Sequence, residues 1–109
     1  MGIEITGWGK CTPSAVLTNS DLETILDTDD EWITTRTGVK QRRIAEAPLS
    51  EIGTVAAKHA LAAADKDPKE IDAVMMATCT PEFLIPSTAS RVQMNIANNT
   101  AAAFDFNSA

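Results

Sequence analysis

The sequence predicts an α/β fold in which helices alternate with buried strands. Two apolar runs, at about 72–79 and 101–106, lack the alternation of a half-exposed strand, so they indicate strands covered on both faces. Segments with helical spacing of their apolar residues lie before and between these runs. Hydrophobic residues make up 44% of the 109-residue chain and charged residues 22%, which is ordinary for a globular protein and argues against disorder.

The first elements are expected to be a strand and a short helix. Alternating apolar positions from Ile3 to Gly7 predict a strand over about 3–9. Asn19 is placed to cap a helix whose apolar stripe consists of Leu22, Ile25 and Leu26. We interpret Asn19 and Asp21 as structural residues, because helix capping accounts for them.

A capping box marks the next helix. Thr28 offers a hydroxyl to the exposed amides of a helix start, and Glu31 stands three residues later, so we expect a helix from Asp29 to about Arg36. Gly38 ends it, with Arg36 favourably placed in the last turn. Residues 39–45 then form a basic strand or extended segment.

The rest of the chain continues the alternation. A long alanine-rich helix is expected to begin at Ser50, and Pro68 suits the first position of a short helical turn. The strand at 72–79 follows, then a helix capped by Ser87, then the strand at 101–106. Helices between buried strands favour some parallel pairing. The sequence shows no internal repeat or linker, so one domain, or part of one, is expected.

Charge and targeting features restrict the function classes. Fifteen acidic residues against nine basic ones give a net charge of −6, which argues against a nucleic-acid binder. The chain has no apolar run long enough to cross a bilayer, and its start lacks a signal-peptide pattern. The two cysteines show no metal or redox spacing, so we expect a reduced, cytoplasmic setting and no disulfide. The bases gather locally, however, at Arg36, Lys40, Arg42 and Arg43.

Trp32 and Arg36 are the strongest candidates for ligand binding. They are four residues apart on the predicted helix and share a face, with Thr28 one turn earlier. An indole offers a flat surface to a base, and a guanidinium grips phosphate at two points. With Thr37 and the basic cluster, this face suits a nucleotide carrying several phosphates. The alternative is a local cation–π pair on a solvated helix, and the residues alone leave it open.

The sequence alone names no catalytic group. His59 is interpreted as a partly buried structural histidine, and without a second histidine a histidine-based metal cluster is not expected. Cys79 follows a predicted strand, where a nucleophile could be displayed, but no base is evident near it. We therefore interpret Cys79 as a small buried apolar residue.

A collinear series of motifs links the chain to a known family. The most specific signal is Asp27-Thr28-Asp29-Asp30-Glu31-Trp32-Ile33 followed by Arg36-Thr37-Gly38. The other matching stretches are Thr18–Glu23, Arg42–Ala45, Ala56–Leu61, Ile71–Asp72, Ala77–Pro81, Pro86–Ala89, Val92–Gln93 and Ala103–Ala109. Over essentially its whole length the chain resembles β-ketoacyl-acyl-carrier-protein synthase III.

The resemblance implies a thiolase-like layered α/β fold, with residues 1–109 as an incomplete N-terminal thiolase-like domain. The family works as a homodimer. A cysteine takes an acyl group from acyl-CoA and passes it to malonyl-acyl-carrier protein, with a histidine and an asparagine stabilising the developing charge. The resemblance puts that cysteine directly after Ala109 and the other two later, so we expect no catalytic residue in this chain. A short native terminus is the alternative explanation for the end at Ala109.

The resemblance also assigns substrate-binding roles. Trp32 would stack on the adenine of CoA with Thr28 beside it, Arg36 would hold the phosphates, and Thr37 lies next to that contact. Ile85 matches a position that walls the partner subunit's acyl pocket. Acyl-CoA is then a substrate, and no cofactor or metal is expected. Expected partners are acyl-carrier protein, a second copy and the remainder of the polypeptide, without nucleic acid or membrane. Two alternatives are a same-fold acyltransferase of specialised metabolism and a non-catalytic CoA- or nucleotide-binding fragment.

Overall fold

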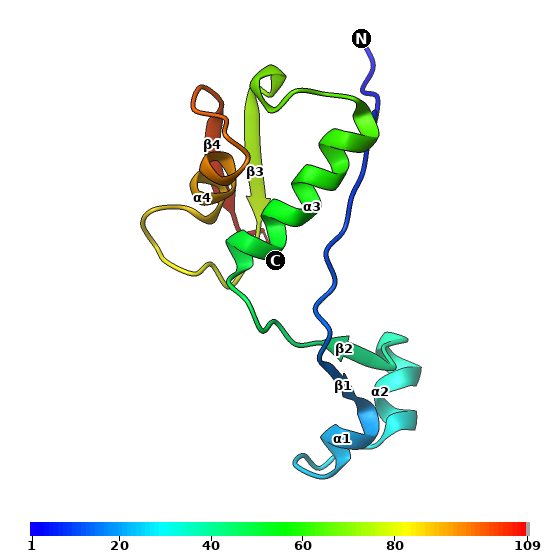
Figure 1. The fold of residues 1–109 in the computed structure, drawn as a ribbon. Helices are drawn as coiled ribbons and strands as arrows, with labels where there is room; N and C mark the ends of the chain where they lie inside the picture. The colour runs from blue at the N-terminus through cyan, green and yellow to red at the C-terminus, as the bar shows by residue number, and fades with distance from the viewer. Residues whose placement is uncertain (109) are drawn as a thin grey trace. The chain divides into compact units, whose positions relative to one another are not determined.

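The computed structural model describes residues 1–108 and divides the chain into two compact units. The smaller unit is Thr12–Glu46. The larger unit joins Met1–Cys11 to the chain from Ala47 onward. Figure 1 shows the helices and strands of each. The sequence-based assignment of 1–109 to one incomplete domain stays a prediction.

The smaller unit is a two-stranded ribbon with two short helices. Strand β1 (Val16–Thr18) pairs antiparallel with β2 (Gln41–Arg43), with Leu17 opposite Arg42. Helices α1 (Asn19–Glu23) and α2 (Asp30–Thr37) lie between the two strands in the sequence. The prediction of an extended basic segment at 39–45 is confirmed by β2, whereas β1 was not predicted.

The larger unit combines a parallel strand pair with two helices. Its elements are α3 (Leu49–Ala64), the 3₁₀ turn η1 (Pro68–Glu70), β3 (Ala73–Ala77), α4 (Thr88–Asn95) and β4 (Ala102–Phe106). Strands β3 and β4 run parallel, with Val74 opposite Ala103. Helix α4 packs against α3 and against both strands. The predicted α/β class and the parallel pairing are confirmed.

The apolar core of the larger unit lies on α4. Ala89 and Val92 on the helix and Ile96 at its C-cap are almost fully buried. The N-terminus of α4 is capped twice: the Ser87 hydroxyl accepts from the Ser90 amide, and the Asp105 carboxylate of β4 accepts from the amides of Thr88 and Ala89, both at 2.7 Å. The predicted cap at Ser87 is confirmed, and Asp105 adds a tertiary cap that local sequence does not reveal.

The predicted strand at 3–9 is wrong. Among residues 1–108 this segment pairs with no strand and instead runs along α3. A Cβ on Gly7 would fall 2.5 Å from the carbonyl oxygen of Ala60, and one on Gly9 would fall 2.4 Å from that of Ala56. The two glycines therefore let the backbone lie directly on the helix, which alternation alone does not distinguish from a strand.

The predicted N-caps of α1 and α2 are each one residue away from the observed ones. Thr18, not Asn19, caps α1 and shares a capping box with Asp21. This helix ends at Glu23, so Ile25 and Leu26 lie beyond it as exposed side chains and form no buried stripe. Asp29, not Thr28, caps α2. Both α2 and its predicted end at Gly38, which has φ 71°, are confirmed.

The strands at 73–77 and 102–106 are confirmed, but their expected burial on both faces is wrong for the described residues. Exposed and half-buried positions alternate along both. Met75, Phe104 and Phe106 are exposed, and 62% of Met75 is accessible. One face of the strand pair carries the helices, and the other presents apolar side chains.

Candidate functional site

A hollow of about 610 Å³ lies in the smaller unit, around the start of α2. Trp32 and Thr28 line it, together with Leu22, Leu26, Asp27, Asp29, Ile33 and Arg42. The lining therefore combines apolar and aromatic side chains with a guanidinium and carboxylates. The structure brings two of the five predicted substrate-binding residues, Thr28 and Trp32, to one cavity.

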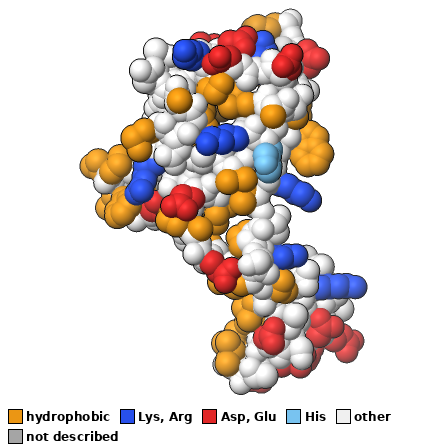
Figure 2. Space-filling model, in the orientation of Figure 1, with side chains coloured by type: hydrophobic (Ala, Val, Ile, Leu, Met, Phe, Trp, Pro, Cys, Tyr) orange, Lys and Arg blue, Asp and Glu red, His pale blue; other side chains and the backbone are white. Residues whose placement is uncertain are grey.

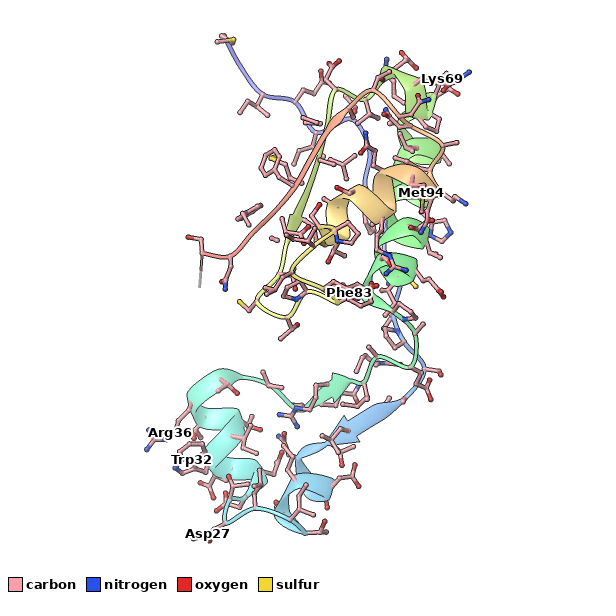
Figure 3. The ribbon with its side chains drawn as sticks, turned by 90° about the vertical axis from the view of Figure 1, so that its left-hand side faces the viewer. Asp27, Trp32, Arg36, Lys69, Phe83 and Met94 are labelled. Carbon is pink, nitrogen blue, oxygen red and sulfur yellow. The ribbon has the colours of Figure 1, made fainter. Side chains whose placement is uncertain are left out.

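Helix α2 holds Trp32 and Arg36 side by side (Figure 3). The Asp29 carboxylate accepts from the Trp32 amide at 2.7 Å and fixes the first turn. One turn later, the Arg36 guanidinium lies 4.6 Å from the centroid of the Trp32 ring. Because 53% of Trp32 remains accessible, its ring keeps surface for a second stacking partner. The cation–π pair that the sequence left open as the alternative to ligand binding is present, and more than half of Trp32 is still accessible to a ligand.

Thr28 presents an unused polar group beside the indole. Its hydroxyl oxygen is buried and has no hydrogen-bond partner among the described residues. A hydroxyl can both donate one hydrogen bond and accept others. Burying it without a partner is unfavourable, and Thr28 is one of the residues that line the hollow.

Thr37 and Ile85 do not line this hollow. The Thr37 hydroxyl donates to the Ile33 carbonyl at 2.7 Å and accepts from the Val39 amide at 3.1 Å, so it is engaged in closing α2. Ile85 belongs to the larger unit, where it lies in the loop between β3 and α4 with 88% of its surface accessible.

Two members of the basic cluster have structural partners. Arg42 donates to the side-chain oxygen of Asn19 at 2.9 Å, and Arg43 donates to the Pro13 carbonyl at 3.1 Å. Arg36 and Lys40 remain exposed. The cluster is therefore divided: Arg36 and Lys40 are available to an exposed anion, while Arg42 faces the hollow from a fixed position.

Asn19 organises the smaller unit and was misread as a helix cap. Only 2% of it is accessible. Its amide group donates to Asp30 at 2.7 Å and to the Val39 carbonyl at 2.9 Å, while its oxygen accepts from Arg42. One side chain thus connects α1 to α2 and β2. Its partners lie 11 to 23 residues away in sequence, so no local pattern could reveal them.

A smaller hollow of about 250 Å³ lies at the carboxyl ends of β3 and β4. Cys79 lines it, and its thiol lies 3.2 Å from the side-chain oxygen of Asn107. The prediction that Cys79 is buried is wrong: it is exposed, because the strand ends two residues earlier. Phe106, Asn107 and Ser108 also line this hollow. They belong to the stretch Ala103–Ala109, which resembles the segment before the family's nucleophile. Ala109 itself lies outside the described residues.

His59 is exposed, so the expectation of partial burial is wrong. Its Nδ1 lies 3.2 Å from the Lys10 carbonyl, which links α3 to the N-terminal segment and supports the structural interpretation. Within residues 1–108 no group of three or more potential ligands is arranged to hold a metal ion. Nor does any helix there have the length and apolar character needed to cross a membrane.

Glu82, in the loop between β3 and α4, caps the start of α3. Pro48, at the N-cap position of α3, provides no side-chain hydrogen bond. The Glu82 carboxylate instead accepts from the Ser50 amide and pairs with Arg91 of α4 at 3.2 Å. The Ser50 hydrogen bond, helped by Arg91, lowers the pKa of Glu82 below its usual value. Ser50 was predicted to begin α3, but the helix starts at Leu49 and its cap comes from a residue 32 positions away.

The sequence of this chain is similar to part of several known proteins. The chain is 58% identical over 106 residues to beta-ketoacyl-acyl-carrier-protein synthase III 2 of Vibrio cholerae, covering 97% of this chain and 29% of that protein. It is 50% identical over 110 residues to the beta-ketoacyl-acyl-carrier-protein synthase III of Aquifex aeolicus, covering the whole chain and 36% of that protein. The chain is similar to one part of β-ketoacyl-acyl-carrier-protein synthase III.

Solved structures agree with the sequence comparison. The crystal structure of 3-oxoacyl-acyl-carrier-protein synthase III from Aquifex aeolicus superposes with a TM-score of 0.90 at 49% identity, covering 98% of this chain and 35% of that one. The priming β-ketosynthase of the R1128 polyketide pathway gives 0.87 at 33% identity, covering 96% of this chain and 32% of that one. The thiolase-like α/β fold is thereby confirmed.

These similarities concern a portion of longer proteins. The chain spans about a third of the length of the curated relatives it matches. No protein-family profile matches it.

Proposed function

We propose that the protein carrying this chain is a decarboxylative condensing enzyme of the β-ketoacyl-acyl-carrier-protein synthase III type. The observation that carries the proposal is the 58% identity to such a synthase across 97% of the chain. The exposed Trp32–Arg36 pair beside a hollow of about 610 Å³ supports it, because a CoA ester needs both an aromatic platform and a cation.

The proposed reaction has two stages. In the first, a cysteine thiolate bonds to the acyl carbonyl carbon of acyl-CoA, the bond to the CoA sulfur breaks, and CoA leaves as its thiol after gaining a proton. In the second, the malonyl group on acyl-carrier protein loses carbon dioxide, and the electron pair left on its carbon attacks the thioester. The cysteine thiolate is expelled and a β-ketoacyl-carrier protein forms.

This chain contributes binding to that reaction. Trp32 stacks on the adenine with Thr28 beside it, and Arg36 neutralises phosphate charge. Thr37 supports the end of α2 next to Arg36 rather than reaching the ligand itself. Ile85 forms part of the wall of the partner subunit's acyl pocket. The catalytic cysteine, histidine and asparagine of this reaction are not among these residues, so the chain supplies substrate recognition. We further propose a homodimeric, cytoplasmic enzyme.

The test is acyl transfer by the complete protein. Incubation with acetyl-CoA followed by intact mass spectrometry should show the gain of one acetyl group that hydroxylamine removes. Trp32→Ala should raise the KM for acetyl-CoA about tenfold by removing the stacking surface. Lys69→Gln, which changes an exposed lysine of η1 (Figure 3), is the control and should leave the KM unchanged. A wild-type protein that gains no acyl group would contradict the proposal.

A same-fold acyltransferase of specialised metabolism is the second candidate. The similarity to the priming β-ketosynthase of a polyketide pathway, with a TM-score of 0.87, favours it. Both enzymes would acylate a cysteine, so the acceptor distinguishes them. Condensation with malonyl groups on the carrier protein of fatty-acid synthesis supports the first candidate, and reaction only with another carrier or acceptor supports the second.

A further inference from the structure

The hollow around Trp32 is built from three separate elements. Leu22 comes from α1, Trp32 from α2 and Arg42 from β2. The helices are short, with five residues in α1 and eight in α2, and helices of this length are marginal in water by themselves. Figure 2 shows acidic and basic side chains on the surface over α2. Within Thr12–Glu46, all of which the structure describes, Ile33 alone among the apolar side chains is buried, so apolar packing does little to fix the three elements.

Asn19 connects these elements through hydrogen bonds. It is the first residue of α1, and only 2% of it is accessible. Its side-chain amide donates to Oδ1 of Asp30, at the start of α2, at 2.7 Å and to the Val39 carbonyl at 2.9 Å. Its side-chain oxygen accepts from Nη1 of Arg42 at 2.9 Å, and its backbone amide donates to the Lys40 carbonyl at 3.2 Å. One buried residue therefore joins α1 to α2 and to β2.

Two of these contacts lead to side chains of the hollow. Asp30 stands two positions before Trp32, and the Thr34 hydroxyl donates to the same Asp30 oxygen at 3.2 Å, so the contact holds the helix that carries the indole. Arg42 lines the hollow itself, and its hydrogen bond to Asn19 restricts a long side chain that otherwise samples many rotamers. A site whose side chains are already placed loses less conformational entropy when a ligand binds.

We propose that Asn19 is a positioning residue for the nucleotide end of acyl-CoA: it holds α2 and Arg42 in the arrangement that the hollow needs before the ligand arrives. This inference rests on the proposed function. Asn19 is buried and is not among the residues that line the hollow, so it acts through Trp32 and Arg42. Loss of this preorganisation weakens the binding of substrate and transition state alike, so it raises the KM for acyl-CoA and leaves kcat unchanged.

The experiment measures two quantities on the complete protein. Calorimetry gives the Kd for adenosine 3′,5′-bisphosphate, the nucleotide part of CoA, and steady-state kinetics gives KM and kcat for acetyl-CoA. We expect Asn19→Ala to raise both Kd and KM about tenfold with kcat unchanged, because side chains that were ordered in advance must then be ordered on binding.

Asp30 provides a matched pair of variants that leaves the buried position intact. Asp30→Ala removes the oxygen to which Asn19 donates, whereas Asp30→Asn keeps an oxygen there and loses the same charge. Asp30 is exposed and is not among the residues that line the hollow. We expect Asp30→Ala to raise the Kd about threefold, the worth of one hydrogen bond, and Asp30→Asn to bind as wild type does.

Gly9→Ala is the control for a general loss of stability, because Gly9 belongs to the larger unit and lies on α3. Below its unfolding temperature this variant should keep the wild-type Kd and KM. An equal rise in Kd for Gly9→Ala and Asn19→Ala would show that Asn19 acts only through overall stability and would overturn the inference. Wild-type binding by a folded Asn19→Ala protein would overturn it as well.

If Asn19→Ala does not fold, the Asp30 pair decides, and equal Kd values for Asp30→Ala and Asp30→Asn overturn the inference. A wild-type protein that takes no acyl group from acetyl-CoA contradicts the proposed function instead.

Discussion

Each of the two units is stabilised internally by a different kind of interaction. In Thr12–Glu46 the most buried side chain is Asn19, and its hydrogen bonds join α1, α2 and β2. In the larger unit the buried side chains of Ala89, Val92 and Ile96 pack between α4 and its neighbours. A short segment with little apolar surface to bury can thus be ordered by a satisfied polar network, and the candidate ligand site lies on that network.

The largest expected effect tests the polar network. Asn19→Ala should lower the free energy of unfolding of the complete protein by about 3 kcal/mol, because it removes all the hydrogen bonds that the buried Asn19 side chain makes to Asp30, Val39 and Arg42. Chemical denaturation measures this loss, and hydrogen exchange should place it in residues 16–43. Ser20→Ala, on the exposed side of α1, is the control. Equal stability of Asn19→Ala and Ser20→Ala would contradict the conclusion that the polar network stabilises the smaller unit.

The next effect tests close packing in the larger unit. Gly9→Ala should cost about 2 kcal/mol, because its Cβ would meet the Ala56 carbonyl at 2.4 Å and the backbone must shift. Gly2→Ala is the matched control, since nothing lies within 4 Å of the added atom. Thermal unfolding of the two variants measures the difference. Wild-type behaviour of Gly9→Ala would mean that the segment lies less tightly on α3.

A smaller effect is expected at the end of α2. Gly38 has φ 71°, a conformation that costs other residues energy, so Gly38→Ala should destabilise the protein by about 1 kcal/mol. No atom lies within 4 Å of the added Cβ, so the change isolates backbone strain from packing. Denaturation midpoints check the value. A loss as large as that of Asn19→Ala would indicate that the stability of α2 depends on its C-terminal end as much as on the polar network.

The smallest effect is a pH dependence that sharpens the comparison. The folded pKa of Glu82 is lowered, so its contribution to stability is complete above the ordinary glutamate pKa of about 4.3 and is lost as the pH falls through the lower folded value. The pKa of Asp21 in the smaller unit is also lowered, but by its own capping box with Thr18. Denaturation at a series of pH values should show a shallower acid loss for Glu82→Gln than for wild type. An unchanged slope would show that Glu82 gains nothing from its partners.

Local sequence patterns predicted most of the helices and strands but few of the tertiary contacts between them. The strands near 73–77 and 102–106, the end of α2 at Gly38 and the pairing of Trp32 with Arg36 follow from residues close in the chain. The N-terminal segment was misread because two glycines placed for close approach to α3 resemble an alternating strand. Strand β1 was missed because three residues carry too little periodicity to register.

The sequence by itself determined the α/β class, the Trp32–Arg36 face and the similarity to the synthases, because each depends on short-range spacing or on collinear motifs. Only the tertiary structure decided what Asn19, Asp105 and Glu82 do. Each of the three side chains hydrogen-bonds to at least one group that is 11 or more residues away, and Asp105 and Glu82 cap helices to which they do not belong. A polar side chain satisfies whichever partner folding brings to it, so its role depends on the assembled backbone rather than on its neighbours in sequence.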